Sequence, residues 1–183
     1  MIREILTAVA VLLPVTAAAT PIRGTLPWTD PRPAARDATL LRATMVTAHN
    51  QARQRYGVGP LAWNDGLARD AALYARRLAA SARFEHDPQP GRRPKQGENL
   101  WMGTRSAYSY GEMINLLIAE RRDFRPGRFP AVSRTGRWSD VGHYTQIVWP
   151  TTQLVGCATA SNRGSDYLVC RYWPAGNIVG VAL

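Results

Sequence analysis

The stretch Gly142-His143-Tyr144-Thr145-Gln146-Ile147-Val148-Trp149 decides how this sequence of 183 residues is interpreted. A histidine and a tyrosine open a run of β-branched and aromatic residues, which is bounded by Gly142 and Pro150. A short apolar run between such breakers predicts a strand. An imidazole can bind a metal or transfer a proton near neutral pH. The stretch therefore predicts a strand that begins with a functional histidine.

A second stretch, Tyr167-Leu168-Val169-Cys170-Arg171-Tyr172-Trp173-Pro174-Ala175-Gly176-Asn177, predicts a strand that is ended by proline and glycine. Together the two stretches resemble the two signature sequences of the CAP superfamily. That superfamily comprises the cysteine-rich secretory proteins, the antigen 5 venom allergens and the plant pathogenesis-related group 1 proteins. The resemblance covers about residues 41–180 and suggests a bacterial-type single-domain member. It implies a CAP (SCP) domain over residues 39–183.

The N-terminal residues resemble a targeting signal. Arg3 leads into an apolar run over residues 5–19, and Ala17-Ala18-Ala19 fits a signal-peptidase site. The run is shorter than the roughly 20 apolar residues that a spanning helix needs. We therefore expect a signal peptide at residues 1–19, and residues 20–38, with four prolines, as an extended segment. The mature chain should be exported to the periplasm or cell surface, without a transmembrane segment.

The composition is that of one soluble globular domain, with a net charge of +10 that comes almost wholly from arginine. We favour compositional bias as the reason for this charge. The alternative is attraction to anionic envelope polymers, lipid head groups or nucleic acid. The arginines are scattered and no nucleic-acid-binding motif is present, so we expect no nucleic-acid partner. We expect a monomer.

Apolar periodicity and capping residues predict three helices in the middle of the chain. They cover about residues 37–56, 65–82 and 109–122. Asp37 should cap the first helix and Gly57 should end it, and Ser109 with Glu112 has the spacing of a capping box. Residues 124–141 form a long irregular connection of the kind that often lines a site.

The last third of the sequence predicts a small antiparallel sheet with strands at residues 143–149, 154–160 and 167–172. If the second hairpin closes symmetrically, Ala160 faces Tyr167 and Cys157 faces Cys170. Facing cysteines in an exported protein predict a disulfide, worth roughly 3 kcal/mol for so small a loop. Helices on both faces of the sheet would complete an α+β fold, a three-layer α/β/α sandwich.

The CAP resemblance also implies a cleft that carries two histidines and two glutamates. The family pattern is carried over here to His49 in His49-Asn50-Gln51-Ala52-Arg53, to Glu98 in Gly97-Glu98-Asn99, to Glu120, and to His143. His86 matches a recurrent CAP position outside this tetrad, and we expect it to have a packing or hydrogen-bonding role.

In this interpretation His49 and His143 are the metal ligands, while Glu98 and Glu120 accept the remaining imidazole N–H groups. Two protein ligands predict weak binding of zinc or another divalent cation. The same four groups could serve a metal-dependent hydrolase of peptidase type, or could form a purely structural polar network. No nucleophile motif or metalloprotease pattern is present, so enzyme status stays open and we favour binding.

The function expected from the sequence is an exported, non-enzymatic binding module. CAP relatives in fungi and plants bind sterols and related lipids, so the expected ligand is a lipid, a sterol-like molecule or an envelope component. Tyr144 and Trp149, together with residues 124–141, are the expected lining. The sequence lacks the cysteine-rich tail of the vertebrate secretory members, which disfavours ion-channel blocking.

Overall fold

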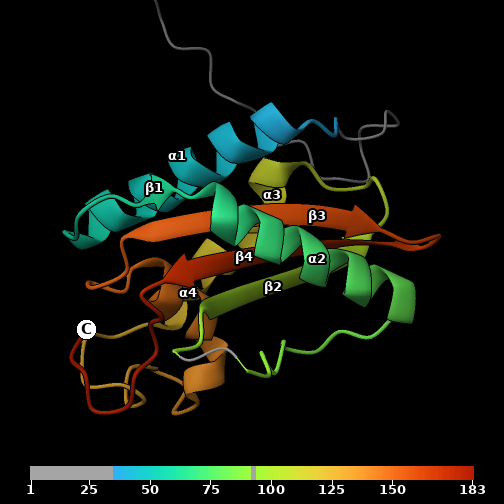
Figure 1. Cartoon of the computed structure of the whole chain (residues 1–183). Helices are drawn as coiled ribbons and strands as arrows, with labels where there is room; N and C mark the ends of the chain where they lie inside the picture. Colours follow the sequence, from blue (N-terminus) through green and yellow to red (C-terminus); the bar gives the residue numbers. More distant parts are fainter. Residues whose placement is uncertain (1–34, 92–93) are drawn as a thin grey trace, which may run out of the picture.

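The computed structural model describes residues 35–91 and 94–183. The signal peptide and most of the extended segment that the sequence predicts lie outside the described residues. The elements, shown in Figure 1, are α1 (Ala38–Tyr56), β1 (Ala62–Trp63), α2 (Asp65–Ser81), β2 (Gly97–Thr104), α3 (Tyr110–Ile118), the 3₁₀ helices η1 (Ala119–Asp123) and η2 (Trp138–Asp140), α4 (Gly142–Ile147), β3 (Leu154–Ser161) and β4 (Ser165–Trp173).

The four strands form one sheet in the order β1-β3-β4-β2. Strand β4 pairs antiparallel with both β2 and β3, and the very short β1 pairs parallel with β3. The β3–β4 hairpin has the predicted register, in which Ala160 faces Tyr167 and Cys157 faces Cys170. The two cysteines form a disulfide, as predicted.

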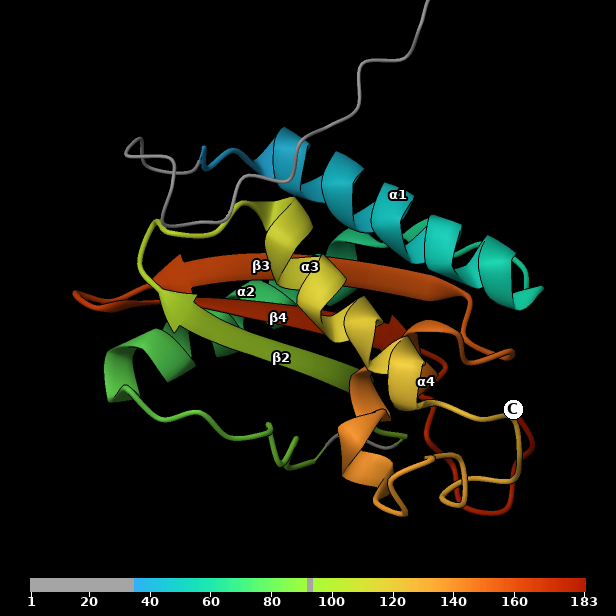
Figure 2. The ribbon, with the colours of Figure 1, turned by 180° about the vertical axis from the view of Figure 1, so that it is seen from behind.

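Helices cover both faces of the sheet, which confirms the predicted three-layer α/β/α sandwich. Helix α2 lies on the face toward the viewer in Figure 1, and α1, α3 and α4 lie on the other side, seen from behind in Figure 2. The two interfaces contain separate hydrophobic clusters. The cluster under α2 is formed by Ala71, Tyr74, Ala75, Leu78, Ala79, Leu100, Tyr167 and Val169. The larger cluster, on the other face, includes Met45, Met113, Tyr144, Ile147 and Trp149.

Local capping signals define the ends of the predicted helices. The Asp37 side chain accepts the Leu40 N–H at the start of α1, and Gly57 ends the helix with φ +87°. The predicted capping box of Ser109 and Glu112 begins α3. Helix α3 ends at Ile118 and continues as the 3₁₀ helix η1, so Glu120 lies in η1.

The strand predicted at residues 143–149 is wrong, because residues 142–147 form helix α4. Tyr144 through Ile147 are all buried, and a run that is buried on every side has the same apolar pattern in a helix and in a strand. No side chain within α4 caps its N-terminus. The third long strand is instead β2, at Gly97–Thr104, where the sequence predicts no strand.

A buried arginine joins α1 to the chain that follows α4. Arg53 is 1% exposed. Its guanidinium donates to four backbone carbonyl groups, those of Gly59, Ile147, Trp149 and Thr152. Burial lowers the Arg53 pKa to about 10. These bonds fix α4 against the end of α1.

Within residues 35–91 and 94–183, none of the helices combines the length and the apolar character that crossing a membrane requires.

Candidate functional site

A polar cleft of about 360 Å³ lies where the first residues of β2 meet α4 and the chain after β4. Its side chains come from four separate parts of the sequence. The lining residues are His86, Asp87, Gln89, Gln96, Gly97, Glu98, Asn99, Trp138, Ser139, Gly142, His143, Gln146, Ala175, Gly176 and Asn177. The structure therefore places two of the four tetrad candidates, His143 and Glu98, in one cleft together with His86.

His86 and Glu98 form the first histidine–glutamate pair. The His86 Nδ1 atom lies 2.6 Å from Glu98 Oε1, an oxygen that also accepts the backbone N–H of Asp87 at 3.1 Å. The carboxylate is 5% exposed, whereas the imidazole is 67% exposed. The hydrogen bond to Glu98 raises the His86 pKa, and partial desolvation opposes this effect. With Nδ1 held by the carboxylate, Nε2 is available to a ligand.

His143 and Glu120 form the second pair. The His143 Nδ1 atom lies 2.5 Å from Glu120 Oε1. The other oxygen, Oε2, accepts the backbone N–H groups of His143 and Tyr144 at 2.9 and 3.1 Å. Glu120 thus caps α4 from 23 residues away and fixes the ring of the helix's second residue. The cap that α4 lacks locally is supplied by the tertiary structure.

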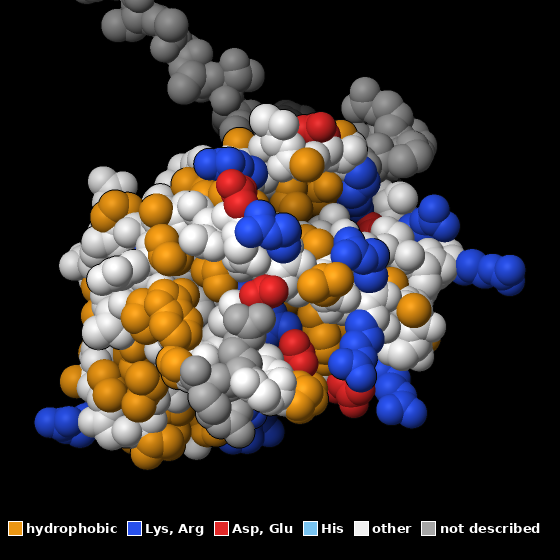
Figure 3. All heavy atoms as spheres, viewed as in Figure 1, with side chains coloured by type: hydrophobic (Ala, Val, Ile, Leu, Met, Phe, Trp, Pro, Cys, Tyr) orange, Lys and Arg blue, Asp and Glu red, His pale blue; other side chains and the backbone are white. Residues whose placement is uncertain are grey.

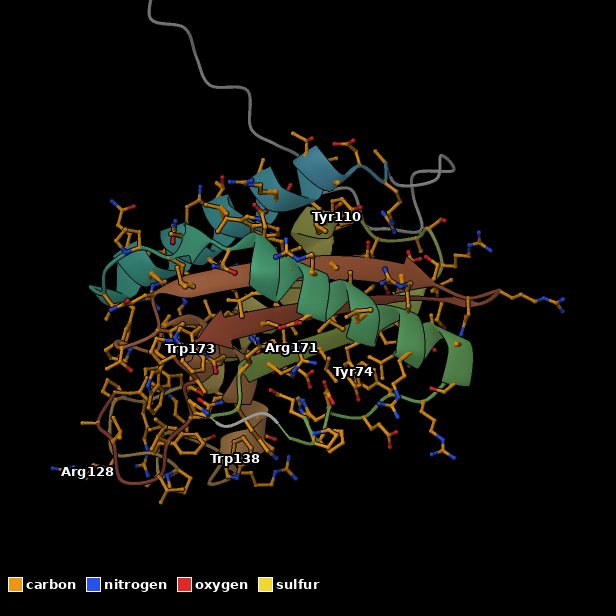
Figure 4. The ribbon with its side chains drawn as sticks, in the orientation of Figure 1. Tyr74, Tyr110, Arg128, Trp138, Arg171 and Trp173 are labelled. Carbon is orange, nitrogen blue, oxygen red and sulfur yellow. A yellow bond between two sulfur atoms is a disulfide. The ribbon has the colours of Figure 1, made fainter. Side chains whose placement is uncertain are left out.

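A buried arginine stands behind the first pair. The Arg171 side chain is 2% exposed, and its Nη2 lies 2.6 Å from Asp87 Oδ2 and 3.0 Å from Glu98 Oε2. Its guanidinium carbon lies 5.2 Å from the centre of the Tyr74 ring. Figure 4 shows Arg171 and Tyr74 between the sheet and α2. Arg171 is the cation that compensates the buried carboxylate of Glu98.

The placement of His49 in the tetrad is wrong. His49 is fully buried on α1, one turn after Met45, and it does not line the cleft. Its Nδ1 donates to the Met45 carbonyl at 2.7 Å, so Nε2 accepts the Tyr172 hydroxyl at 2.8 Å. Burial lowers its pKa to about 4, which keeps the ring neutral. His49 is a core residue, and His86 takes the cleft position that was predicted for it.

The predicted ligand contacts of Tyr144 and Trp149 are also wrong. Their exposed fractions are 2% and 0%, and both belong to the larger hydrophobic cluster. Of the 124–141 connection, Trp138 and Ser139 do line the cleft. A separate apolar groove of about 840 Å³ lies beside β3, between the first turns of α1 and α2. Its apolar lining includes Leu41, Trp63 and Tyr110.

The sequence does contain local signals for the positions of His49 and His86. His49 lies four residues after Met45 and three before Ala52, which is the spacing of a buried helix face. His86 follows α2 in a loop, where exposed polar residues often serve function. The roles of Arg171 and Trp138 had no local signal, because each depends on contacts distant in sequence.

Comparison with known proteins agrees with this fold. A family model described as "CAP: Cysteine-rich secretory protein family" matches residues 46–172. A pathogenesis-related protein of PR-1 type from Sambucus nigra is 34% identical over 136 residues, covering 74% of this chain and 77% of its own. The Golgi-associated plant pathogenesis-related protein 1 of Homo sapiens is 34% identical over 138 residues, covering 74% and 83%.

A solved structure has the same architecture at lower sequence identity. BmVAL-1 superposes with a TM-score of 0.65 and 22% identity, covering 82% of this chain and 84% of that one. At this identity the similarity concerns the fold.

Proposed function

The chain belongs to the cysteine-rich secretory protein (CAP) family, and from this premise we propose that it is an exported binding module whose cleft takes its ligand through His86 and His143. The disulfide between Cys157 and Cys170 supports export, because such bonds persist in oxidising compartments.

The observation that carries the proposal is the matched orientation of the two histidines. In each pair Nδ1 is bound by a carboxylate, so that Nε2 is the free nitrogen. Both rings line one cleft. A carboxylate that holds the far nitrogen of an imidazole fixes its tautomer and strengthens it as a ligand or hydrogen-bonding group.

The two imidazoles, His86 and His143, suit a divalent cation such as zinc, which they would bind weakly. The two imidazoles would hold it, and Glu98 and Glu120 would orient them. When bound, the cation would supply open coordination positions for a polar group of the ligand. Across the described ranges 35–91 and 94–183, no group of three or more His, Cys, Asp or Glu side chains is placed to hold a metal. A secure zinc site has three or four protein ligands, so we expect low affinity.

The hydrophobic ligand expected from the sequence would bind in the groove beside β3, which is separate from the cleft of His86 and His143. The lining of the groove beside β3 combines Leu41, Trp63, Tyr110 and several alanines with charged residues, which are Arg36, Asp37, Arg42, Asp65 and Arg69. Concave sites with mostly apolar surface and a few polar groups accommodate small molecules. We propose this groove, in place of Tyr144 and Trp149, as the site for a fatty acid or sterol-like molecule. Substituting the half-buried Ala72 with phenylalanine should fill the groove and abolish retention of such a ligand.

The cleft is tested by titrating the purified chain with Zn²⁺ in a calorimeter. We expect weak binding that the His86→Ala/His143→Ala double substitution abolishes. His49→Gln is the matched control, because it changes the third histidine of the chain outside the cleft and should leave the zinc affinity of the folded protein unchanged. Equal binding by the double variant, or none by the unsubstituted chain, would refute the cation-binding part of the proposal.

An activity assay on His143→Ala and His49→Gln distinguishes a binding protein from a hydrolase. If the protein were a metal-dependent peptidase, a reproducible hydrolytic activity would disappear in His143→Ala and persist in His49→Gln. A binding module gives ligand retention without turnover.

A further inference from the structure

The connection before α4 and the last residues of the chain are joined into one unit, here called the loop lobe and defined as residues 124–141 and 174–183. Phe129 and Val181 share a backbone hydrogen bond of 2.9 Å, and Gly180 donates to the Phe129 carbonyl at 2.8 Å. Gly127 and Leu183 exchange two further backbone bonds. The lobe is therefore a paired structure with a defined surface.

Apolar side chains are exposed on this surface. Val179 is 75% exposed, Ile178 49% and Trp138 48%. Trp138 contacts Phe129 edge to face, with ring centres 5.3 Å apart, so its position is tied to the same paired backbone. Figure 3 shows hydrophobic side chains gathered at the end of the molecule that carries the C-terminus in Figure 1. Ile178 and Val179 are adjacent in the chain, and Trp138 lines the same cleft as Asn177, the residue before them. Exposed apolar residues gathered in one part of the surface mark an interaction site.

The charge around these residues is positive. The lobe has four exposed arginines, Arg125, Arg128, Arg134 and Arg137, against one acidic side chain, Asp140. Asp140 is already bound by Arg137 and Thr135. The Arg128 guanidinium donates to the carbonyl of Gly180, the residue after Val179, at 2.8 Å, and Figure 4 shows Arg128 at the outer edge of the molecule.

We propose that the loop lobe docks on an anionic phospholipid bilayer, with Ile178, Val179 and Trp138 at the acyl boundary and the arginines among the head groups. Positive charge alone would suit any polyanion. Exposed aliphatic tips beside a tryptophan favour a surface that has an apolar layer beneath its charge. Arginine stems can lie along such a layer while their guanidinium groups stay among phosphates.

This docking goes beyond the proposed function and does not depend on it. The two meet at Trp138, which belongs both to the lobe and to the cleft lining. A protein docked through the lobe would hold the mouth of the cleft close to the membrane surface, where an envelope ligand would be encountered.

The test is sedimentation with vesicles of phosphatidylcholine that contain phosphatidylglycerol, compared with vesicles of phosphatidylcholine alone. All variants are made in the full chain, so any contribution from the apolar run at residues 5–19 is the same in each. We expect binding that requires phosphatidylglycerol and weakens as salt is raised. Each arginine near the surface is worth about five-fold in affinity, so Arg125→Gln/Arg128→Gln should lose about 25-fold.

The apolar tip gives the second, discriminating measurement. Ile178→Ser/Val179→Ser leaves the charge unchanged and should weaken vesicle binding by at least roughly ten-fold, since each buried methylene contributes. Matched controls are Arg163→Gln, on the exposed turn between β3 and β4, and Leu73→Ser, which is 62% exposed on α2. Both should bind as the unsubstituted chain does.

Three results would overturn the proposal. The first is the absence of any preference for anionic vesicles. The second is equal loss in the lobe variants and in the controls, which would indicate a diffuse effect of net charge. The third is an unchanged Ile178→Ser/Val179→Ser variant combined with full competition by a soluble polyanion, which would assign the surface to a polymer.

Discussion

The two histidine–glutamate pairs of the cleft look equivalent but are held by different means. Glu98 is held by one backbone N–H, that of Asp87 at Oε1, and by a buried cation, since Arg171 Nη2 lies 3.0 Å from Oε2. Glu120 is anchored by the main chain, since two backbone N–H groups of α4 donate to it. The first pair has a largely exposed imidazole, and the second has one that is 30% exposed.

The two carboxylates expose little surface, 5% for Glu98 and 19% for Glu120, and they are compensated in two different ways. A counter-charge compensates Glu98 through an ion pair whose members are costly to separate. A helix N-terminus compensates Glu120 through partial charges that belong to the backbone. The first arrangement depends on the identity of one residue, Arg171. The compensation of Glu120 depends on the backbone of helix α4 and tolerates changes in most of the side chains of that helix.

The largest expected effect follows from removing that counter-charge. Arg171→Met would leave Glu98 and Asp87 without their shared cation, and breaking a buried ion pair from one side costs about 3–5 kcal/mol. We expect a loss of this size in urea unfolding. Arg122→Met removes a guanidinium that is 82% exposed beside Asp123 and should change stability little. Equal midpoints for the two variants would show that Glu98 does not depend on Arg171.

The pH dependence of the free energy of unfolding distinguishes buried His49 from the two cleft histidines. The pKa of His49 in the folded protein is about 4, below the ordinary 6.5, because burial penalises the charged ring. The unfolded chain therefore takes up this proton first, and stability should fall as the pH drops from about 6.5 to about 4. The whole loss is about 3 kcal/mol.

His86 should contribute the opposite slope, because its folded pKa is raised by Glu98. That contribution is present below the unfolded pKa and is lost as pH rises through the folded value. Urea unfolding across this range, repeated with His49→Gln, separates the two. A loss of stability between about pH 6.5 and about pH 4 that is as large in His49→Gln as in the unsubstituted protein would contradict the assignment to His49.

A smaller effect is expected from the other carboxylate. Glu120→Ala removes the acceptor for the His143 and Tyr144 N–H groups and should cost about 2 kcal/mol, as loss of a strong helix cap does. Glu120→Gln keeps an acceptor oxygen and should retain most of the stability. Amide exchange at His143 and Tyr144 should accelerate in the alanine variant. Identical exchange in both variants would show that the helix does not depend on this cap.

Local chemistry made much of the fold predictable from the sequence. Asp37, Gly57 and the Ser109–Glu112 box are contained in single short segments, and each acts where the sequence predicts. The β3–β4 register followed from the symmetry of a short hairpin, and the disulfide followed from that register. Helix α4 could not be predicted in this way, because its cap comes from Glu120, which is remote in sequence.

The site was predicted only where the family pattern and the local pattern agreed. Glu98 and His143 line the cleft, and Glu120 holds His143 from behind. His49 was assigned by its sequence context, although its position on the buried face of α1 indicated the core. His86, for which the sequence predicts a packing or hydrogen-bonding role, does hydrogen-bond to Glu98 and is also the second cleft histidine. Trp138 lies in the loop that was expected to line a site, but nothing in that loop singled it out.

The backbone acceptors of Arg53 have a consequence for how this protein can diverge. Every partner of its guanidinium is a carbonyl of Gly59, Ile147, Trp149 or Thr152, which any amino acid supplies. A change of side chain at these positions therefore leaves the hydrogen bonds of the joint in place, although Ile147 and Trp149 are also held by their packing in the larger hydrophobic cluster. Arg53 itself has no such freedom, since lysine cannot reproduce its fork of donors. The joint therefore constrains the side chain of Arg53 more than it constrains the side chains of the residues that Arg53 binds.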